Sequence, residues 1–242
     1  MLAVMLAVLL AVLLGAAACS AAGNGGLGSS ANAQAPGEGR VAATSLPEYK
    51  VTVAGDSISV GFGAQLREVV PVPVVVKVIG EEGTGLARPD RFDWPARLST
   101  LARDFPPRVL VFSVGSNDAQ DLRDVAGNIV TRFADTAAWD AAYRQRLAAS
   151  FDAFAPPTST RVVWLGHVCT KDAKVCANNR RVHRLAEQVA TTRPWVEVVD
   201  LAALLGTGET PADRCLMDDG LHVTSACLQE AATAMRLSIS PP

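Results

Sequence analysis

The sequence predicts an α/β protein, a three-layer α/β/α sandwich around a mostly parallel sheet of five strands. Short valine-rich runs alternate along the chain with longer segments whose apolar residues recur at helical spacing. The runs are apolar at nearly every position, which is typical of strands that helices cover on both faces of a parallel sheet. Strands are expected at 49–54, 72–79, 108–114, 161–168 and 196–200, and helices at 58–69, 94–104, 136–154, 178–192 and 223–237.

The N-terminal residues 1–19 have the composition of a signal peptide. The first charged residue of the chain is Glu38, and the apolar stretch 2–14 runs into small residues that end at Cys19. Ala-Ala-Cys resembles a bacterial lipobox, in which Cys19 is lipidated and becomes the mature N-terminus. Ordinary secretion and an uncleaved anchor are the alternatives. Residues 20–46, rich in Gly, Ala, Ser and Asn, predict a flexible tether, and 47–240 form the domain.

Composition limits the classes of function. With 242 residues, 49% hydrophobic and 19% charged, the chain suits one globular domain plus an extension. The formal net charge is −2, and the 22 Lys and Arg are scattered along the chain. We therefore expect no nucleic-acid partner, and we expect a monomer.

Four cysteines remain besides Cys19. In an exported protein an even number predicts disulfides, and four cysteines allow three connectivities. Short loops favour Cys169–Cys176 and Cys215–Cys227, each worth roughly 2.5 to 3 kcal/mol in the loop-entropy model. We expect no metal site, since the chain has only three histidines and no closely spaced cysteine pair.

Three polar motifs lie near the predicted strand ends or the C-terminus. Gly55-Asp56-Ser57 follows a β-branched run at an expected helix start, Gly115-Ser116-Asn117-Asp118 follows a second apolar run, and Asp219-Gly220-Leu221-His222 lies near the C-terminus. The carboxyl ends of parallel strands meet at one edge of a sheet, where ligands bind. We therefore expect these motifs to converge there.

The motifs supply the parts that an activated serine needs. A serine hydroxyl requires a base and a group that orients the base. The spacing of Asp219 and His222 lets the carboxylate hold the Nδ1–H of the imidazole while Nε2 faces Ser57. The Asn117 amide, the Ser57 N–H and the N–H of Gly83 or Gly85 are candidate donors for an oxyanion hole. We prefer Gly85.

These motifs resemble, in content and order, the blocks of the SGNH hydrolase superfamily, also called GDSL esterases. The resemblance covers roughly residues 48 to 237 and implies a flavodoxin-like three-layer fold. It makes Ser57 the nucleophile, Asp219 the orienting carboxylate, His222 the base, and Ser57, Gly85 and Asn117 the oxyanion donors. The segment 85–95 resembles sequences of a bacterial envelope branch of this superfamily. Members of that branch are similar to SGNH domains that act on acetyl groups of cell-surface glycans. One departure is Gly166-His167-Val168-Cys169, which stands where a proline-containing turn is expected.

Other polar and aromatic residues have ordinary structural interpretations. His183 is expected on a solvated helix face, whereas His167 is either a pocket wall or a structural histidine. Trp94, Trp139 and Tyr143 are expected to pack in the core or at the rim, with substrate contact as the alternative.

The resemblance implies a serine esterase, and the N-terminal segment predicts that it is exported and anchored through lipidated Cys19 on the extracytoplasmic face of the membrane, with secretion as the alternative. It would hydrolyse or transfer short O-acyl groups, acetyl above all, on a cell-envelope glycan or glycolipid, without metal or nucleotide cofactor. A lipase or thioesterase of longer acyl chains is the first alternative. The second is a non-catalytic, tethered binding module with the same fold.

Overall fold

The structure, a computed structural model, describes residues 47–241 and has a five-stranded parallel sheet at its centre. The strand order is β2-β1-β3-β6-β7, and every neighbouring pair is parallel. The strands are β1 Tyr49–Gly55, β2 Val74–Gly80, β3 Val109–Ser113, β6 Arg161–Leu165 and β7 Val196–Val199. All five lie where the valine-rich runs predict them.

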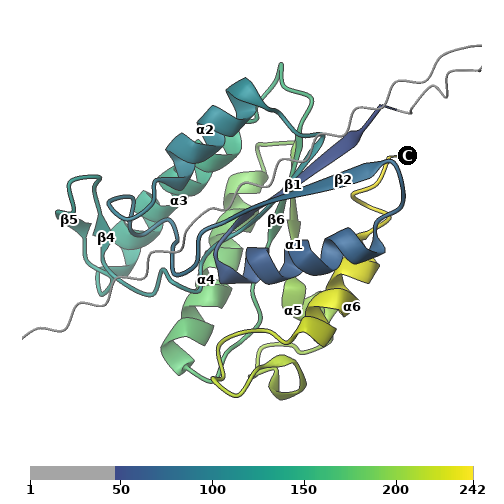
Figure 1. Cartoon of the computed structure of the whole chain (residues 1–242). Helices are drawn as coiled ribbons and strands as arrows, with labels where there is room; N and C mark the ends of the chain where they lie inside the picture. Colours follow the sequence, from purple (N-terminus) through teal and green to yellow (C-terminus); the bar gives the residue numbers. More distant parts are fainter. Residues whose placement is uncertain (1–46, 242) are drawn as a thin grey trace, which may run out of the picture. The chain divides into compact units, whose positions relative to one another are not determined.

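Helices cover both faces of this sheet (Figure 1), which confirms the three-layer sandwich. One face packs against α1 Ser57–Val69, α5 Leu201–Leu204 and α6 Ser225–Met235. The other face packs against α2 Trp94–Asp104, α3 Thr136–Asp152 and α4 Ala173–Ala190.

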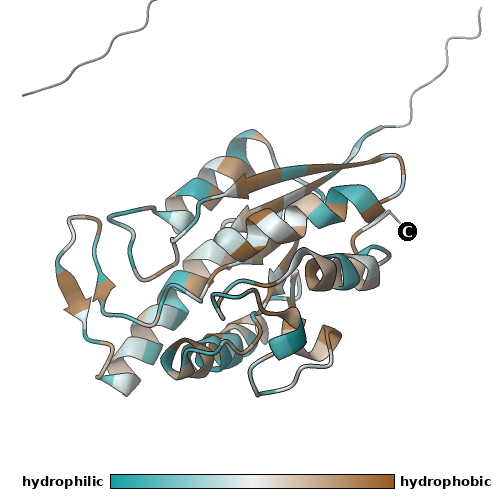
Figure 2. Cartoon of the chain, turned by 60° about the horizontal axis from the view of Figure 1, so that its bottom comes forward, coloured by the Kyte–Doolittle hydropathy of each residue, from teal (hydrophilic) through white to brown (hydrophobic). Residues whose placement is uncertain are grey.

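The middle strand β3 explains the apolar runs of the sequence. Val109 and Val111 point into the core on the α1 side, and Leu110 and Phe112 point into the core on the α3 side. All four are buried because successive side chains of a strand point to opposite faces. The strands accordingly carry apolar residues through the middle of the fold (Figure 2).

Two element boundaries differ from the expected ones, and both lie next to the loop between β6 and α4. Helix α4 begins at Ala173 rather than at 178, because the Asp172 carboxylate caps it by accepting hydrogen bonds from two backbone N–H groups. Strand β6 ends at Leu165 rather than at 168, since the Val168 carbonyl accepts a hydrogen bond from the Asn179 side chain. His167 therefore lies in a loop.

Besides the four-residue helix α5, a short hairpin and a 3₁₀ turn had no counterpart among the expected elements. A hairpin of β4 Leu122–Arg123 and β5 Ile129–Thr131 follows β3, and a 3₁₀ turn spans Asp213–Cys215. Ile129 and Val130 of the hairpin are exposed. The hairpin lies beyond the carboxyl ends of the central strands (Figure 1).

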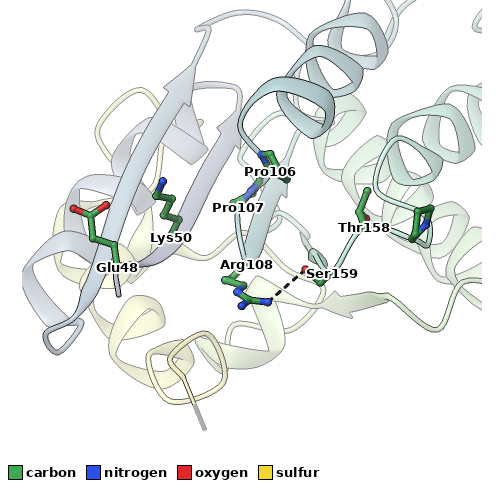
Figure 3. Close-up of a pocket in the computed structure, with 8 residues that line it drawn as sticks. Glu48, Lys50, Pro106, Pro107, Arg108, Thr158 and Ser159 are labelled. Atoms are coloured by element: carbon green, nitrogen blue, oxygen red, sulfur yellow. Dashed lines mark hydrogen bonds between the residues drawn. The ribbon is translucent and has the colours of Figure 1, made fainter. Parts of the chain in front are cut away.

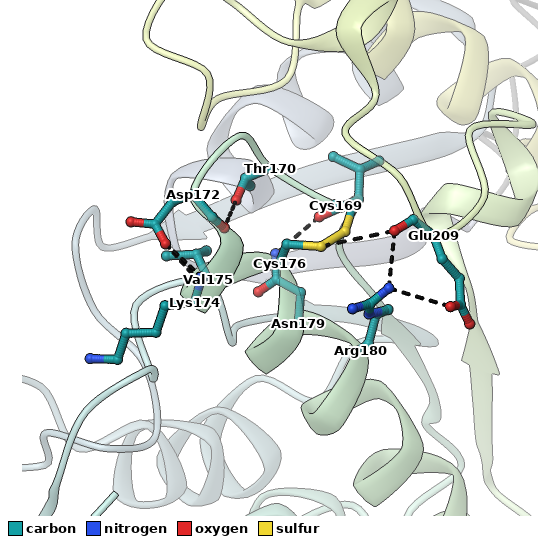
Figure 4. The surroundings of a disulfide bond; sticks show 10 residues. Cys169, Thr170, Asp172, Lys174, Val175, Cys176, Asn179, Arg180 and Glu209 are labelled. Carbon is teal, nitrogen blue, oxygen red and sulfur yellow. Dashed lines mark hydrogen bonds and ion pairs between the residues drawn. A yellow bond between two sulfur atoms is a disulfide. The ribbon is translucent and has the colours of Figure 1, made fainter. Parts of the chain in front are cut away.

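Both expected disulfides are present, Cys169–Cys176 and Cys215–Cys227. The first joins the loop after β6 to the first turn of α4, close to the contact between Arg180 and Glu209 (Figure 4). Two disulfides are typical of a protein that folds outside the cytoplasm.

The chain's expected export and anchoring segments lie outside the described part. The signal peptide, Cys19 and the tether all fall within residues 1–46. Of the helices within residues 47–241, none has both the length and the apolar character needed to cross a membrane.

Candidate active site

Ser57 is placed at the first residue of α1 by a tight turn at the carboxyl end of β1. Gly55 has a φ of +136°, and a Cβ there would lie 1.8 Å from the carbonyl oxygen of Ser113, so the turn requires glycine. Asp56 then caps α1 by accepting a hydrogen bond of 3.0 Å from the N–H of Ile58. Ser57 itself is only partly buried, which leaves its hydroxyl accessible.

His222 and Asp219 lie beside this hydroxyl. His222 Nε2 is 3.1 Å from Ser57 Oγ, and His222 Nδ1 is 2.7 Å from Asp219 Oδ2. With the carboxylate accepting the Nδ1–H, Nε2 of a neutral imidazole carries no proton and faces the serine. The structure thus brings together, from positions 165 residues apart, the nucleophile, base and carboxylate arrangement that activates a serine.

The Asp219 carboxylate is held by its own turn. Its Oδ1 accepts hydrogen bonds from the N–H groups of Leu221 and His222, at 2.9 and 3.0 Å. The hydrogen bond from the His222 ring, followed by these amides, holds the pKa of Asp219 well below its usual range. The carboxylate is therefore ionised at neutral pH and able to stabilise a protonated His222.

The two ends of the segment that carries Asp219 and His222 are held together. Cys215 and Cys227 are bonded, Leu216 bridges to Val223, and the Met217 N–H donates to the His222 carbonyl at 2.8 Å. These contacts hold the turn over the sheet edge. The turn is nevertheless open to solvent, since the side chains of His222 and Asp219 are 48% and 45% exposed.

Asn117 contacts Thr84, the residue that directly precedes Gly85. The Nδ2 of Asn117 donates one hydrogen bond of 2.9 Å to the Thr84 carbonyl, which leaves its second N–H for another acceptor. Gly85 follows Thr84 and is buried, whereas Gly83 is exposed. The structure therefore places Gly85, rather than Gly83, against the turn that carries Asn117.

Asp118 is the residue that ties these two segments together. Its buried carboxylate accepts hydrogen bonds from the N–H groups of Leu86 and Ala87, at 2.9 and 2.7 Å, and from the hydroxyl of Tyr143 at 2.7 Å. A Cβ on Gly85 would lie 2.2 Å from this carboxylate. The close approach leaves room only for glycine at that position.

A pocket of about 250 Å³ adjoins Gly85. Leu86, Phe92 and Val125 line it with apolar surface, and Val125 is 69% exposed. Arg146 closes one side, but its guanidinium is occupied by backbone carbonyls, among them that of Leu86. Motif reasoning missed Arg146, since nothing about a lone arginine in a helix predicts this contact.

The aromatic residues have the packing role expected for them. Trp94, Trp139 and Tyr143 are each 1% exposed or less. The indole N–H of Trp94 also donates to the Thr84 hydroxyl at 3.0 Å and so braces the segment beside Gly85.

The expectation for His183 was wrong. Its side chain is only 19% exposed, and its Nδ1 is buried against Gly166. The helix face that carries it packs on the loop after β6, and the nearby Asn178 and Asn179 are buried and donate to the carbonyls of Gly115 and Val168.

A separate hollow of about 500 Å³ lies near the amino ends of the strands (Figure 3). Lys50, Arg108 and Ser159 are among its lining residues, and Arg108 donates to the Ser159 hydroxyl at 3.4 Å. These residues precede or begin β1, β3 and β6, whereas Ser57 follows the carboxyl end of β1. The hollow is thus at the opposite edge of the sheet from the candidate site.

The fold is that of the SGNH/GDSL hydrolases. A candidate SGNH hydrolase from Slackia heliotrinireducens is similar at a TM-score of 0.57 and 18% identity, over 80% of this chain and 100% of that one. A catalytic mutant of an acetylxylan esterase from Geobacillus stearothermophilus is similar at 0.56 and 16%, over 79% and 94%. A carbohydrate esterase family 3 protein from Talaromyces cellulolyticus is similar at 0.50 and 20%, over 78% and 95%.

The chain belongs to the family described as "Protein of unknown function (DUF459)", whose family model matches residues 50–227. The match includes Ser57, Gly85, Asn117, Asp219 and His222. No curated protein matches the chain.

Proposed function

We propose that this protein is an exported serine esterase that removes or transfers short O-acyl groups, acetyl above all, on a cell-envelope glycan or glycolipid. The observation that carries the proposal is the 3.1 Å contact of Ser57 with His222, together with the 2.7 Å contact of His222 with Asp219. A serine held in this way is a nucleophile toward an ester carbonyl.

In the first step, the proton of the Ser57 hydroxyl passes to His222 Nε2 as Oγ bonds to the carbonyl carbon. The carbonyl oxygen becomes an oxyanion, and the N–H groups of Ser57, Gly85 and Asn117 are the donors assigned to it. The intermediate then expels the alcohol, which takes the proton from His222. Asp219 stabilises the imidazolium throughout.

In the second step, the acyl group leaves Ser57. Water, or a hydroxyl of an acceptor sugar, gives its proton to His222 and attacks the acyl carbonyl. The Ser57 oxygen departs and takes that proton back. Water releases a free acid, and a sugar hydroxyl completes a transfer.

The glycan substrate is supported by likeness and by exposure. Two of the similar structures are described as an acetylxylan esterase and a carbohydrate esterase. The half-exposed His222 and Asp219 leave the site open to a large substrate. Two disulfides support export, and Cys19 is the residue that we assign to a lipid anchor.

A second candidate function is cleavage of longer acyl esters or thioesters. The pocket beside Gly85 favours it, since Phe92 and Val125 offer an acyl chain apolar surface next to the candidate oxyanion donor. p-Nitrophenyl esters of increasing chain length separate the two. A maximum of kcat/KM at acetyl supports the first, and a maximum at six or more carbons supports the second.

The decisive test replaces the nucleophile. Ser57→Ala should lower kcat by several orders of magnitude with little change in stability, because Ser57 is partly exposed and no core cavity results. Ser225→Ala is the matched control, since Ser225 is an exposed serine at the first residue of α6.

A fluorophosphonate, which modifies activated serines, should label the wild type and the Ser225 variant but not the Ser57 variant. Ester turnover in the Ser57 variant above about a tenth of wild type would exclude Ser57 as the nucleophile. A wild type that binds acetylated glycan but is neither labelled nor active would instead be a binding module.

A further inference from the structure

His167 is a buried histidine that the proposed reaction does not use. It lies in the loop after β6, with a side chain that is only 4% exposed. Its Nε2 is 2.8 Å from the Ser113 hydroxyl, and its Nδ1 is 2.8 Å from the Ser116 hydroxyl. Both ring nitrogens are therefore engaged by serines of one neighbouring segment.

The hydrogen bonds of Ser113 fix the tautomer of His167. The Ser113 hydroxyl donates its only proton to the Leu165 carbonyl at 2.9 Å, so it must accept from the ring. Nε2 therefore carries a proton. In a neutral ring Nδ1 is then bare, and it accepts from the Ser116 hydroxyl.

The surroundings of His167 favour this neutral ring. Burial lowers its pKa to about 4. The titratable groups that face it are His183 and Asp56, whose Oδ2 lies 3.8 Å from Nε2. Burial also raises the pKa of Asp56 well above its usual value.

Ser113, at the end of β3, supports the turn that carries Ser57, and Ser116 belongs to the turn that carries Asn117. Ser113 pairs with Gly55, and its carbonyl accepts the Asp56 N–H at 3.0 Å, directly before Ser57. Ser116 directly precedes Asn117. One ring nitrogen of His167 thus contacts Ser113, which holds the turn before Ser57. The other contacts Ser116, which directly precedes Asn117.

We propose that His167 is a positioning residue that fixes the Asn117 turn relative to Ser57. The proposal rests on the esterase function proposed above. His167 acts through Ser113 and Ser116, while His222 is the histidine that contacts the Ser57 hydroxyl. The position is also the one at which a histidine stands in place of an expected proline-containing turn.

The test is the hydrolysis of p-nitrophenyl acetate by His167→Phe, with kcat expressed per site titrated by fluorophosphonate. Displacing the oxyanion donor should lower kcat by about 10- to 100-fold, because small errors in catalytic geometry are costly. KM should change by less than about twofold, since the donor acts on transition-state charge. His167→Gln, whose amide N–H can reach Ser113, should recover part of the loss.

His183→Gln is the matched control, because His183 is the neighbouring histidine and contacts neither serine. It should keep kcat within about twofold of wild type. A merely structural role of His167 would lower the melting temperature and the number of titrated sites while leaving kcat per site unchanged. That outcome would overturn the proposal.

Ser116→Ala removes one link at a partly exposed position, and it therefore tests the idea even where His167→Phe does not fold. Its kcat should fall several-fold. The double variant with His167→Phe should be no slower than His167→Phe alone, because both changes cut the same connection. If the two single-variant losses of kcat multiplied in the double variant, or if Ser116→Ala left kcat unchanged, the connection through Ser116 would be refuted.

The failure of this proposal is distinguishable from failure of the esterase function. A wild type that is neither labelled nor active removes the esterase and the positioning role together. A labelled, active wild type whose His167→Phe and Ser116→Ala variants keep full kcat overturns the positioning role alone.

Discussion

Opening the Cys215–Cys227 disulfide should slow catalysis more than its effect on stability explains. This bridge closes the segment that carries Asp219 and His222. We would replace both cysteines by alanine, because they are buried and serine would place an unpaired hydroxyl in the core. The matched control replaces Cys169 and Cys176, a bridge that closes a shorter loop and meets that segment through the hydrogen bond from the Lys171 N–H to the Gly220 carbonyl.

The two changes should cost similar stability. With cysteines 12 residues apart, the loop-entropy model gives about 3 kcal/mol for Cys215–Cys227. With cysteines 7 apart, it gives about 2.5 kcal/mol for Cys169–Cys176. For a domain of this size each kcal/mol lowers the melting temperature by about 2–4 °C, so each variant should lose about 5–12 °C.

The effects on kcat should differ. His222 Nε2 lies 3.1 Å from Ser57 Oγ, near the outer limit of hydrogen-bond reach, so a looser segment loses the contact readily. Backbone hydrogen bonds such as Met217 N–H to the His222 carbonyl and Lys171 N–H to the Gly220 carbonyl remain and limit the movement. We therefore expect kcat to fall about 10-fold, less than the 100-fold that a full 1 Å displacement can cost.

The assay is ester hydrolysis at 25 °C, with kcat per fluorophosphonate-titrated site, alongside thermal unfolding. The control variant should lose clearly less kcat at a comparable loss of melting temperature, because its loop holds the catalytic segment only through the Lys171–Gly220 hydrogen bond. Equal losses of kcat in both variants would mean that stability alone is responsible. An unchanged kcat after loss of Cys215–Cys227 would show that the backbone contacts suffice to hold His222.

Three further predictions concern individual residues. Asn117→Ala should lower kcat by roughly 100- to 1000-fold with a much smaller change in KM, and a rise in KM at constant kcat would make it a ground-state contact instead. Gly85→Ala should abolish activity or folding, because its Cβ would lie 2.2 Å from Asp118, whereas Gly83→Ala, with a φ of +70° and open space, should cost about 1–2 kcal/mol of stability and leave kcat intact. Asp219 has a folded pKa below its unfolded value of 3.8, so it stabilises the fold above about pH 4 and this contribution is lost as the pH falls further. Thermal unfolding of wild type from pH 6 to 2.5 should accordingly be steeper in pH than that of Asp219→Asn, and parallel curves would contradict this.

The strands were predictable because burial on both faces of the sheet requires a continuous run of apolar residues, which is visible in the local sequence. Residues 109–112 of β3 are all apolar, and no tertiary information is needed to recognise such a run. The β4–β5 hairpin was not predictable in this way, since its strands are two and three residues long and its apolar residues face solvent. The start of α4 was missed although Asp172 offered a capping signal.

The residues of the candidate site could be proposed from motifs, but the residues that support them could not. Asp118 follows Asn117 in the motif, yet its bonds to Leu86 and Ala87 join segments more than 30 residues apart. The error on His183 has the same origin. A run of asparagine and arginine suggests a solvated face, whereas Asn178 and its neighbour are buried and satisfy loop carbonyls.

The accessibility of the triad bears on the choice between hydrolysis and transfer. A transferase must keep water from the acyl-enzyme until its acceptor arrives, and a site does so by enclosing the acyl group. Here the side chain of His222, the proposed base, is 48% exposed and that of Asp219 is 45% exposed, so solvent reaches the ring that would activate a second nucleophile. We therefore expect hydrolysis to dominate when the domain acts alone, and transfer to require an acceptor that covers His222 as it binds.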